Sequence, residues 1–524
     1  MQLTTRRSRR TSSVLDLHGK PYASVSEVYQ GFGGSDPYKG ASHSRRATSM
    51  WAPGAGSADA DILGNLADLR TRSRDLARNA PMAAGALVTL ETNTIGGGLH
   101  CEPEIPNQVL GISEEEADQL EEQFKQEFKL WGASVECDLS RKNVWEGIQQ
   151  IAFRSWHESG DVGVLLPMLT RPGSVYETKV QLIEADRIEN PFNRPNTELL
   201  VNGVEMDRSG APVALHVLKR HPGDLYAIAN MFASDRVETF GKRSGRRNAW
   251  LLMDETRPGQ TRGVPYLAVA MEQLKQIERY TDAELMAAVV DGTFTVFIKS
   301  EQSEDFMPLA SLPFGSTSTD AYGDNDYALD YGAVIPLRPG ESIESADPKR
   351  PNRAFGEFVR AIAEQIGAGL GIPFELLIKH FTASYSAARA ALLEADKMFQ
   401  KKRGRFAHGF CQPVYEAVIT EAILLGRLSA PGFFDDPVKR LAYLSCTWVG
   451  PSPGQLNPVN EAEAAKIRID AGLSTLATET PAISGQDWRE VHKQRVREHR
   501  VRVRDGLDIL PQQPTRRIGG TEQD

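Results

Sequence analysis

Apolar residues recur at helical spacing in two long stretches near the middle of the chain. Leu267, Leu274 and Leu285 belong to the apolar face of a stretch at about 266–290, which predicts an amphipathic helix. A stretch at about 354–370 repeats the pattern and predicts a second helix. The polar segment between them contains two short β-prone runs, at 294–298 and 333–337. The pattern therefore predicts a long helix, a small β-containing insert and another long helix.

Helical patterns also precede and follow this central arrangement. Capping residues, prolines in first turns and apolar faces predict helices over residues 66–79, 81–94, 114–132, 387–425, 460–471 and 487–500. Between residues 161 and about 228, short runs of β-branched and apolar residues alternate with Gly, Pro and Asn turns, which predicts strands. The fold class that these elements predict is α+β and mainly helical.

Length and charge narrow the class of protein. A chain of 524 residues is too long for one compact core and predicts roughly two to four structural units. Its net charge of -9 differs from the basic domain of a dedicated sequence-reading DNA-binding protein, so any contact with DNA should be local or fleeting. Residues 1–60 are rich in Ser, Gly and Arg, and we expect a flexible basic arm there. The sequence has neither a secretory signal nor an apolar run long enough to predict a transmembrane helix.

Motifs that would indicate catalysis are missing from the sequence. It contains no Walker A loop, no GxSxG elbow and no HExxH pair, so we predict no catalytic residue, no metal and no cofactor. His157 stands beside Glu158 without a second histidine at ligand spacing, and we interpret it as a surface or capped histidine. The four cysteines lie far apart without CxxC pairs, which indicates reduced thiols rather than a disulfide framework or a zinc site.

Several separated segments occur in an order that is typical of one family. An arginine-rich helical segment at 69–79 is followed by Pro81 and a glycine turn at 95–98, and a central segment at 257–265 carries Arg, Pro and Gly at characteristic positions. The other segments are 51–60, 183–188, 202–207, 371–373, 385–389, 448–451 and 457–458. In this combination, over roughly residues 45–500, the chain resembles the lambda-like family of phage portal proteins.

The resemblance implies a structural protein of the virion and not an enzyme. Proteins of this family form a ring of twelve subunits at one capsid vertex, where the terminase large subunit drives double-stranded DNA through the channel. The other partners that it implies are the major capsid or scaffold protein and head-completion or tail adaptor proteins, with assembly in the host cytoplasm and no membrane. Another head structural or adaptor protein, or a DNA-processing or head-maturation enzyme, remains as the alternative.

The resemblance also implies a portal fold with wing, stem, clip, tunnel loop and crown. We map these parts by element order alone. The mapping expects a basic arm at 1–60, a wing at 61–265, stem helices at 266–291 and 351–371, a clip at 292–350, a tunnel loop at 372–388, a wing or crown helical region at 389–500 and a disordered tail at 501–524.

The candidate residues for the DNA channel lie in the predicted tunnel loop or directly after it. Basic side chains at a constriction would steer the duplex without holding it, since many phosphate-neutralising residues would bind it strongly. The candidates are Lys379, His380, Tyr385, Ser386 and Arg389. For Lys379 and His380, surface salt bridges or subunit contacts are the alternative. For the other three residues, the alternative is packing at the base of the loop.

The arginine-rich helix supplies candidates for contacts between subunits. Its basic residues are Arg70, Arg72, Arg74 and Arg78. We expect them to form ion pairs between subunits or within the domain rather than contacts with DNA. A head-to-tail interface of this kind closes into a ring when the rotation between subunits permits it.

Overall fold

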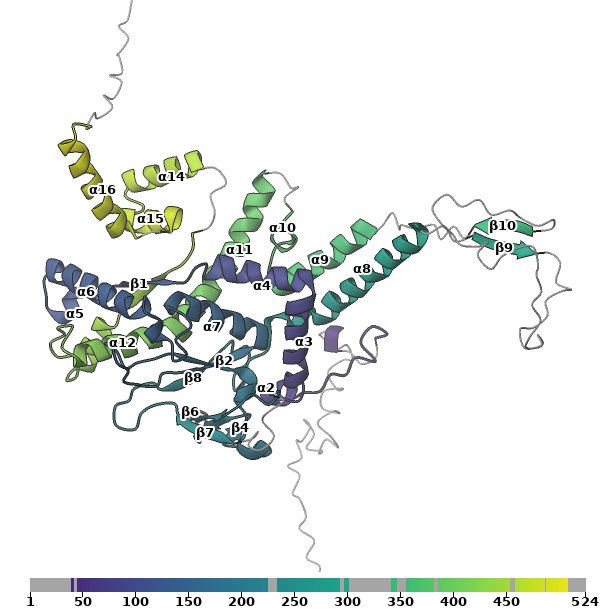
Figure 1. The fold of residues 1–524 in the computed structure, drawn as a ribbon, viewed down its shortest axis with the longest axis horizontal. Coiled ribbons are helices and arrows are strands. Elements are labelled where there is room, and N and C mark those ends of the chain that lie inside the picture. Colours follow the sequence, from purple (N-terminus) through teal and green to yellow (C-terminus); the bar gives the residue numbers. More distant parts are fainter. Residues whose placement is uncertain are drawn as a thin grey trace, which may run out of the picture. The chain divides into compact units, whose positions relative to one another are not determined.

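The structure is a computed structural model, and it describes nine parts of the chain. These are residues 39–41, 45–224, 233–292, 296–300, 341–345, 355–380, 385–452, 458–485 and 487–507. The chain divides into two units, residues 1–57 and residues 58–524, and all that follows concerns the second unit. The unit is α+β and mainly helical, as predicted (Figure 1). Much of the predicted basic arm lies outside the described residues.

Helices form most of the first part of this unit. They are α2 (Ala58–Ile62), α3 (Leu66–Asn79), α4 (Pro81–Thr94), α5 (Asn107–Leu110), α6 (Glu114–Gly132) and α7 (Trp145–Ser159). The predicted helices at 66–79, 81–94 and 114–132 are confirmed. Pro81 occupies the first turn of α4, where its missing N–H costs nothing. Ser113 and Glu116 form a capping box that starts α6.

Short antiparallel strands follow α7, as the sequence predicted. One sheet has the order β3 (Gln181–Glu184), β2 (Asp161–Leu165), β8 (Ala249–Met253). The other contains β4 (Leu200–Val201), β5 (Val204–Met206), β6 (Pro212–Leu218) and β7 (Ser234–Glu238), in that order. Two 3₁₀ turns, η3 (Ala185–Arg187) and η4 (Pro191–Asn193), lie between β3 and β4. These strands cover the part of the core that holds the site described below.

The predicted helix, insert and helix are present. A 3₁₀ turn, η6 (Tyr266–Ala270), leads into α8 (Met271–Gly292), and α9 (Phe355–Leu370) packs beside α8 (Figure 1). Tyr280 of α8 contacts Phe355 and Phe358, with ring centroids 5.5 and 5.0 Å apart. In the insert, β9 (Val296–Ser300) pairs with β10 (Glu341–Ser345), so the first predicted strand is confirmed. The other predicted run, 333–337, lies outside the described residues.

The C-terminal part is helical with one strand. It contains α10 (Phe374–Leu377), α11 (Tyr385–Phe406), a π-helical segment at Ala407–Cys411, α12 (Gln412–Leu424), α13 (Pro437–Tyr443), β11 (Cys446–Val449), α14 (Pro458–Asp470), α15 (Leu476–Ser484) and α16 (Trp488–Arg504). Strand β11 pairs with β1 (His100–Pro103), far away in the sequence. The sequence did not predict α15. The predicted disordered tail is wrong at its start, because α16 continues to Arg504.

An aromatic core joins α6 and α7 to the long C-terminal helices. Phe128 of α6 contacts Trp145 and Tyr415 edge-on, at centroid distances of 5.8 and 5.3 Å. The interpretation of His157 as a surface or capped residue is wrong, because its side chain is only 2% exposed. It packs against Phe153 with ring centroids 4.2 Å apart, since the helical spacing of α7 turns it towards the core. In the described residues, no helix is long and apolar enough to cross a membrane.

Candidate functional site

Four of the segments singled out in the sequence converge on one buried carboxylate, that of Asp161. This residue begins β2 directly after Gly160, where α7 ends, and its exposed fraction is 0%. Its hydrogen-bond partners come from α3 and from the segment 257–265. The segments 183–188 and 202–207 join them through Arg262, which reaches Ala185 and Asn202, and through the pair of Arg74 with Asp186. We call the group the arginine hub, and its members are Arg70, Arg74, Asp161, Asp186 and Arg262.

Arg262 uses every N–H of its guanidinium group. Its Nε and Nη2 donate to the two carboxylate oxygens of Asp161 at 2.8 and 2.9 Å. Nη2 also donates to the carbonyl of Ala185, and Nη1 donates to the carbonyls of Ile188 and Asn202, each at 2.8 Å. A guanidinium offers five donors in a fixed plane, and all five are satisfied here. Arg262 therefore joins β2 to η3 and to the turn between β4 and β5.

Two of the four arginines of α3 belong to the hub. Arg70 Nη2 donates to both carboxylate oxygens of Asp161 at 2.9 and 3.0 Å, and its Nε donates to the carbonyl of Ser159 at 3.0 Å. Arg74 donates to the Ser159 hydroxyl at 3.1 Å and pairs with Asp186. These contacts lie within the chain. Of the two kinds of ion pair expected for these arginines, between subunits or within the domain, Arg70 and Arg74 therefore form the second kind.

The other two arginines of α3, Arg72 and Arg78, are exposed. Helical spacing places Arg72 on the opposite side of α3 from Arg70, whereas Arg78 lies about one turn beyond Arg74, at the end of the helix. Contact with a second subunit therefore stays a prediction for Arg72 and Arg78.

Two glycines allow the segment 257–265 to approach β2. Gly160 has φ +91°, and a Cβ there would lie 2.5 Å from the carbonyl oxygen of Gly263. A Cβ at Gly263 would lie 2.0 Å from the carbonyl oxygen of Gly160. With both side chains absent, the Gly263 N–H donates to Asp161 Oδ2 at 2.9 Å. Glycine is required at these positions because no other residue permits so close a backbone contact.

Asp161, Arg70 and Arg262 are charged at neutral pH. Burial alone would raise the pKa of Asp161, but the guanidinium groups of Arg262 and Arg70 outweigh it and hold this pKa below its usual range. Burial lowers the pKa of Arg70 to about 10, which leaves the group protonated at neutral pH. A buried carboxylate with saturated partners is poorly placed to exchange a proton with a substrate. The arrangement is suited to holding four segments together rather than to acid–base chemistry.

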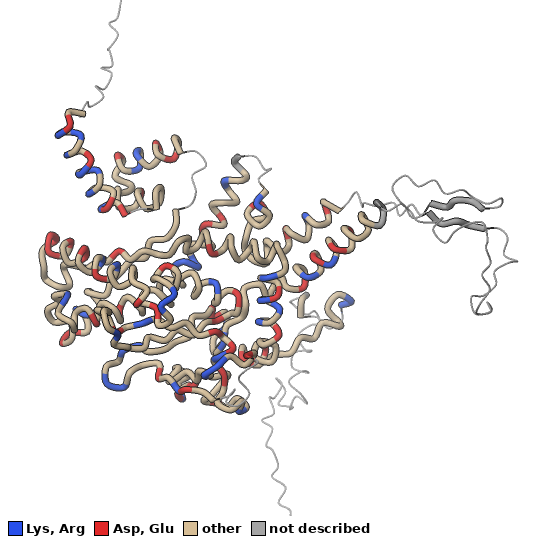
Figure 2. The backbone as a smooth tube through the Cα atoms, viewed as in Figure 1, with Lys and Arg blue, Asp and Glu red and all other residues tan. Residues whose placement is uncertain are grey.

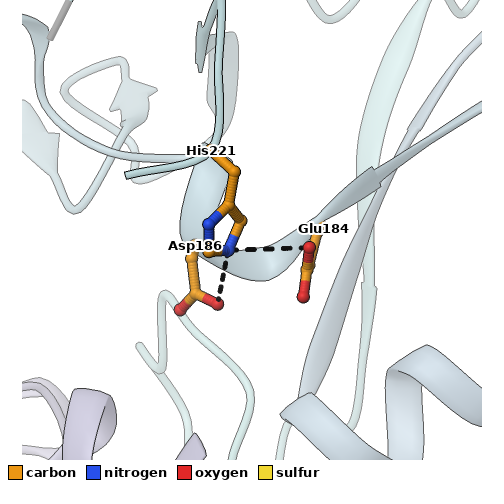
Figure 3. Close-up of side chains that lie close together, drawn as sticks. All are labelled: Glu184, Asp186 and His221. Atoms are coloured by element: carbon orange, nitrogen blue, oxygen red, sulfur yellow. Dashed lines mark ion pairs between the residues drawn. The ribbon is translucent and has the colours of Figure 1, made fainter. Parts of the chain in front are cut away.

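A cluster of one histidine and two carboxylates lies at the edge of the hub (Figure 3). His221 Nε2 is 3.6 Å from Glu184 Oε2 and 3.5 Å from Asp186 Oδ2. This donor set is suited to a divalent metal ion. Arg74, however, already pairs with both carboxylates, so a metal ion would have to compete with a fixed guanidinium. We therefore assign the cluster to the ion pairs of the hub.

The predicted channel candidates lie in the connection between α9 and α11. Gly371, with φ +70°, follows α9, and the short helix α10 comes directly after Pro373. Lys379, which has φ +55°, and His380 then lie exposed. Residues 381–384 lie outside the described residues. The connection is thus partly helical, and its basic side chains face solvent in the single chain.

The remaining three candidates belong to the first turns of α11. Tyr385 and Ser386 begin this helix, but their side chains lie outside what the structure describes. Arg389 Nη1 is 3.6 Å from a carboxylate oxygen of Glu461 in α14. The structure therefore places two candidates in the connection between α9 and α11 and three at the start of α11, and it describes the surroundings of the Lys379, His380 and Arg389 side chains. Their role in a channel stays a prediction.

The apolar face of α8 is only partly covered by the chain itself. Leu267 and Leu274 are buried, at 0% and 1% exposed, where η6 and the start of α8 pack against α3 and α9. Leu285 and Met286, nearer the end of α8, are 63% and 62% exposed. The predicted apolar face of α8 is therefore buried at Leu267 and Leu274 but exposed at Leu285 within one chain. Apolar periodicity predicts the helix and its apolar face, but it does not show whether the same chain or another subunit covers that face.

Sequence reasoning missed Asp161, the centre of the hub. It was noted only as the residue where the helical pattern gives way to strands. A usable signal was present, because an acidic residue immediately precedes the apolar run 162–166 and follows a glycine at a helix end. A charge in such a position is rarely left buried without a partner. Its partners Arg70 and Arg262 are 91 and 101 residues away, and the sequence around them does not indicate that they pair with Asp161.

Several known proteins are similar to this chain over most of its length. The chain is 26% identical over 482 residues to Portal protein B of Escherichia phage lambda, which covers 87% of this chain and 88% of that protein. It is 26% identical over 483 residues to the portal protein of Escherichia phage N15, with the same coverage. Among solved structures, a chain in the virion of a native gene transfer agent particle is similar at a TM-score of 0.42 and 14% identity, covering 78% of this chain and 89% of that one.

The sequence model described as "Phage portal protein, lambda family" matches residues 44–403. That span includes the arginine-rich helix, the hub, both long central helices and the start of α11. It covers more than half of the chain. This protein therefore belongs to the lambda family of phage portal proteins.

Proposed function

We propose that this chain assembles into a ring of twelve subunits, through which a terminase drives double-stranded DNA into the head and through which the DNA later leaves. The family match over residues 44–403 carries the proposal. The protein is a virion component with the role of a portal at the capsid vertex. Its subunit number, its DNA path and its partners, including capsid or scaffold, terminase and tail adaptor proteins, are the proposed parts.

The order of the central elements supports assigning stem and clip. Helices α8 and α9 run side by side and would form the stem, and the insert with β9 and β10 would form the clip on which a terminase docks. Acidic and basic positions are intermixed along both helices (Figure 2). Acidic residues outnumber basic ones on both helices, so a stem surface that faces DNA would repel the duplex rather than hold it. The wing, tunnel loop and crown are proposed by the same order.

The uncovered apolar side chains of α8 support a ring. Monomeric proteins rarely expose neighbouring large apolar residues such as Leu285 and Met286 without a partner for them. A second copy of the chain is a suitable partner, because head-to-tail contacts repeat around a closed ring. We place these two residues in the contact between neighbouring subunits.

The charge of the chain supports passage of DNA rather than tight binding. Each phosphate that a protein neutralises adds to a salt-dependent affinity that would hold the duplex. A net charge of -9 per chain disfavours such binding over most of the surface. Lys379 and His380 are exposed in the proposed tunnel loop and would touch the backbone of the moving duplex. DNA contact is thereby limited to a few side chains of each subunit.

Electron microscopy of negatively stained protein, combined with mass photometry, tests the proposal. We expect rings with a central hole and a mass near twelve copies of the chain. A compact dimer without a hole, obtained also in the presence of capsid or scaffold protein, would contradict it and favour another head protein. The family is structural, and we propose that the chain has no catalytic activity. Nuclease or ATP turnover that co-purifies with the chain and is lost by one point substitution would overturn that part.

A further inference from the structure

Two helices of opposite charge contact each other through their side chains. Helix α16 carries seven basic and two acidic residues, whereas α6 carries seven acidic and two basic residues (Figure 2). No residue within α16 is buried, so burial of apolar side chains contributes little to its attachment. The contact between the two helices therefore depends on charged groups.

Ion pairs connect the first half of α16 to α6. Arg489 donates to a carboxylate oxygen of Glu121 at 2.6 Å and to one of Asp118 at 2.9 Å. Lys493, one turn further along α16, lies 2.8 Å from a carboxylate oxygen of Glu122. Basic side chains of α16 thus already bind carboxylates of α6 within one chain.

The basic face of α16 continues beyond this contact. Five basic residues follow one another at steps of three or four, which places them on one side of the helix. We call them the basic stripe, and its members are Arg489, Lys493, Arg497, Arg500 and Arg504. The last three are exposed. Arg504 pairs with its sequence neighbour, whereas no described residue forms an ion pair with Arg497 or Arg500.

The acidic face of α6 also continues beyond the contact, at the start of the helix. Its members share one side of α6 by the same spacing, and we call them the acidic stripe: Glu114, Glu115, Asp118, Glu121 and Glu122. Glu114 and Glu115 are exposed, and no basic side chain in the described part of the chain pairs with either. Each helix therefore presents charges that the other helix in the same chain does not meet.

We propose that Arg497 and Arg500 of one subunit bind Glu114 and Glu115 of a neighbouring subunit. The proposal rests on the ring proposed above and names a contact within it. It continues the pairing of the two helices within one chain, with the same residue types on the same two faces. The contact joins two different surfaces, so each copy offers both halves and the contact repeats around a closed ring.

Double-stranded DNA is the other polyanion that the basic stripe would meet in a ring. A duplex carries about one negative charge per 1.7 Å, so it would bring many phosphates close to the acidic stripe beside Arg489 and Lys493. Repulsion between these charges disfavours the duplex. The first turn of α6 brings two carboxylates instead, which match the two arginines that lack a partner within the chain.

Charge reversal in the full-length chain tests the contact. We expect the rings of R497E/R500E, measured by mass photometry at increasing NaCl, to fall apart at lower salt than wild-type rings. The loss of two exposed ion pairs should raise the dissociation constant of each subunit contact roughly tenfold. R495E/R502E changes the charge equally on the opposite side of α16 and should keep the wild-type salt tolerance.

A charge swap identifies the partner residues. Adding E114K/E115K to R497E/R500E should restore the wild-type salt tolerance, with an unchanged circular dichroism spectrum. If the swap restored nothing, Glu114 and Glu115 would not be the partners and the proposal would fall.

The other outcomes separate this contact from the ring itself. Rings of R497E/R500E that tolerate salt as well as wild-type rings would overturn the contact and leave the proposed function standing. A wild-type chain that forms no ring would overturn both. If the rings were unaffected but R497E/R500E bound a labelled DNA duplex more weakly than wild type, the stripe would be a DNA contact and the proposal would be wrong.

Discussion

At Asp161, one carboxylate pairs with two buried guanidinium groups, from segments 91 and 101 residues away in the sequence. Burying charges is costly unless every partner is present, so removing one member leaves the others uncompensated. Arg262 is fully buried and Arg70 is 5% exposed, so water cannot replace the lost carboxylate. The hub is therefore the position at which a single polar substitution should matter most.

We expect Asp161→Asn to lower the free energy of unfolding by about 3–5 kcal/mol, because two guanidinium groups lose their counter-charge in the core. Urea unfolding followed by circular dichroism measures the change. Arg72→Gln is the matched control, since Arg72 is exposed on α3, and it should change stability by less than about 0.5 kcal/mol. Equal effects of the two substitutions would refute the structural role of the hub.

His157 makes the stability of the chain depend on pH. Burial and the nearby charge of Lys402 lower its pKa to about 3, whereas a histidine in an unfolded chain titrates near pH 6.5. Between these values the unfolded chain binds more protons. The free energy of unfolding should fall as the pH drops below about 6.5, by at most about 1.4 kcal/mol per pH unit from this residue.

Unfolding in urea between pH 7 and pH 5 tests this effect. His157→Phe, which keeps an aromatic ring beside Phe153, should reduce the slope of stability against pH. His492→Phe, at an exposed position of α16, should leave the slope unchanged. If the His157 variant kept the wild-type slope, the protonation state inferred for the buried ring would be wrong.

At the scale of elements, α8 is packed along one part and uncovered along another. We expect Leu285→Asp to prevent ring formation, because a carboxylate would be buried without a partner in the subunit contact. Mass photometry should then show mainly single subunits, with an unchanged circular dichroism spectrum. Gln276→Asp introduces the same group at an exposed polar position of α8 and should leave ring formation intact. Rings of normal mass from Leu285→Asp would remove this residue from the interface.

The connection between α9 and α11 is the element on which DNA passage depends in our proposal. Replacing both Lys379 and His380 by Ala should leave the mass of the ring unchanged, because neither side chain is buried. DNA packaging by an in vitro terminase system should fall several-fold. Lys397→Ala, at an exposed position of α11, is the control and should package normally. Normal packaging by the double variant would show that the two residues do not act on DNA and would favour surface salt bridges or subunit contacts as their role.

At the scale of the whole molecule, the net negative charge of the chain should make the ring bind DNA weakly. We expect the assembled ring to bind a short labelled duplex with a Kd weaker than about 10⁻⁶ M at about 150 mM salt, without sequence preference. Fluorescence anisotropy over a range of salt concentrations measures this. Tight binding that persists at high salt would contradict a channel through which DNA slides.

The sequence by itself determined most of the longer helices, their order and the family. Helical periodicity, the capping box at Ser113 and the proline at the start of α4 act over a few residues, so they can be read locally. Helix α15 escaped this reading because a proline, Pro481, lies inside it. The five channel candidates also came from sequence, through the family order, and their roles still await the tests above.

Only the tertiary structure decided which of these elements meet. Arg262 reaches Asp161 across 101 residues, and strands β1 and β11 pair across an even longer separation. The tertiary structure also decided that His157 is buried and that Leu285 is exposed. The residues next to them in the sequence give no sign of this difference. Periodicity identifies the apolar side of a helix, but the partner that covers it is set by packing between distant segments and, for α8, is proposed to be another subunit.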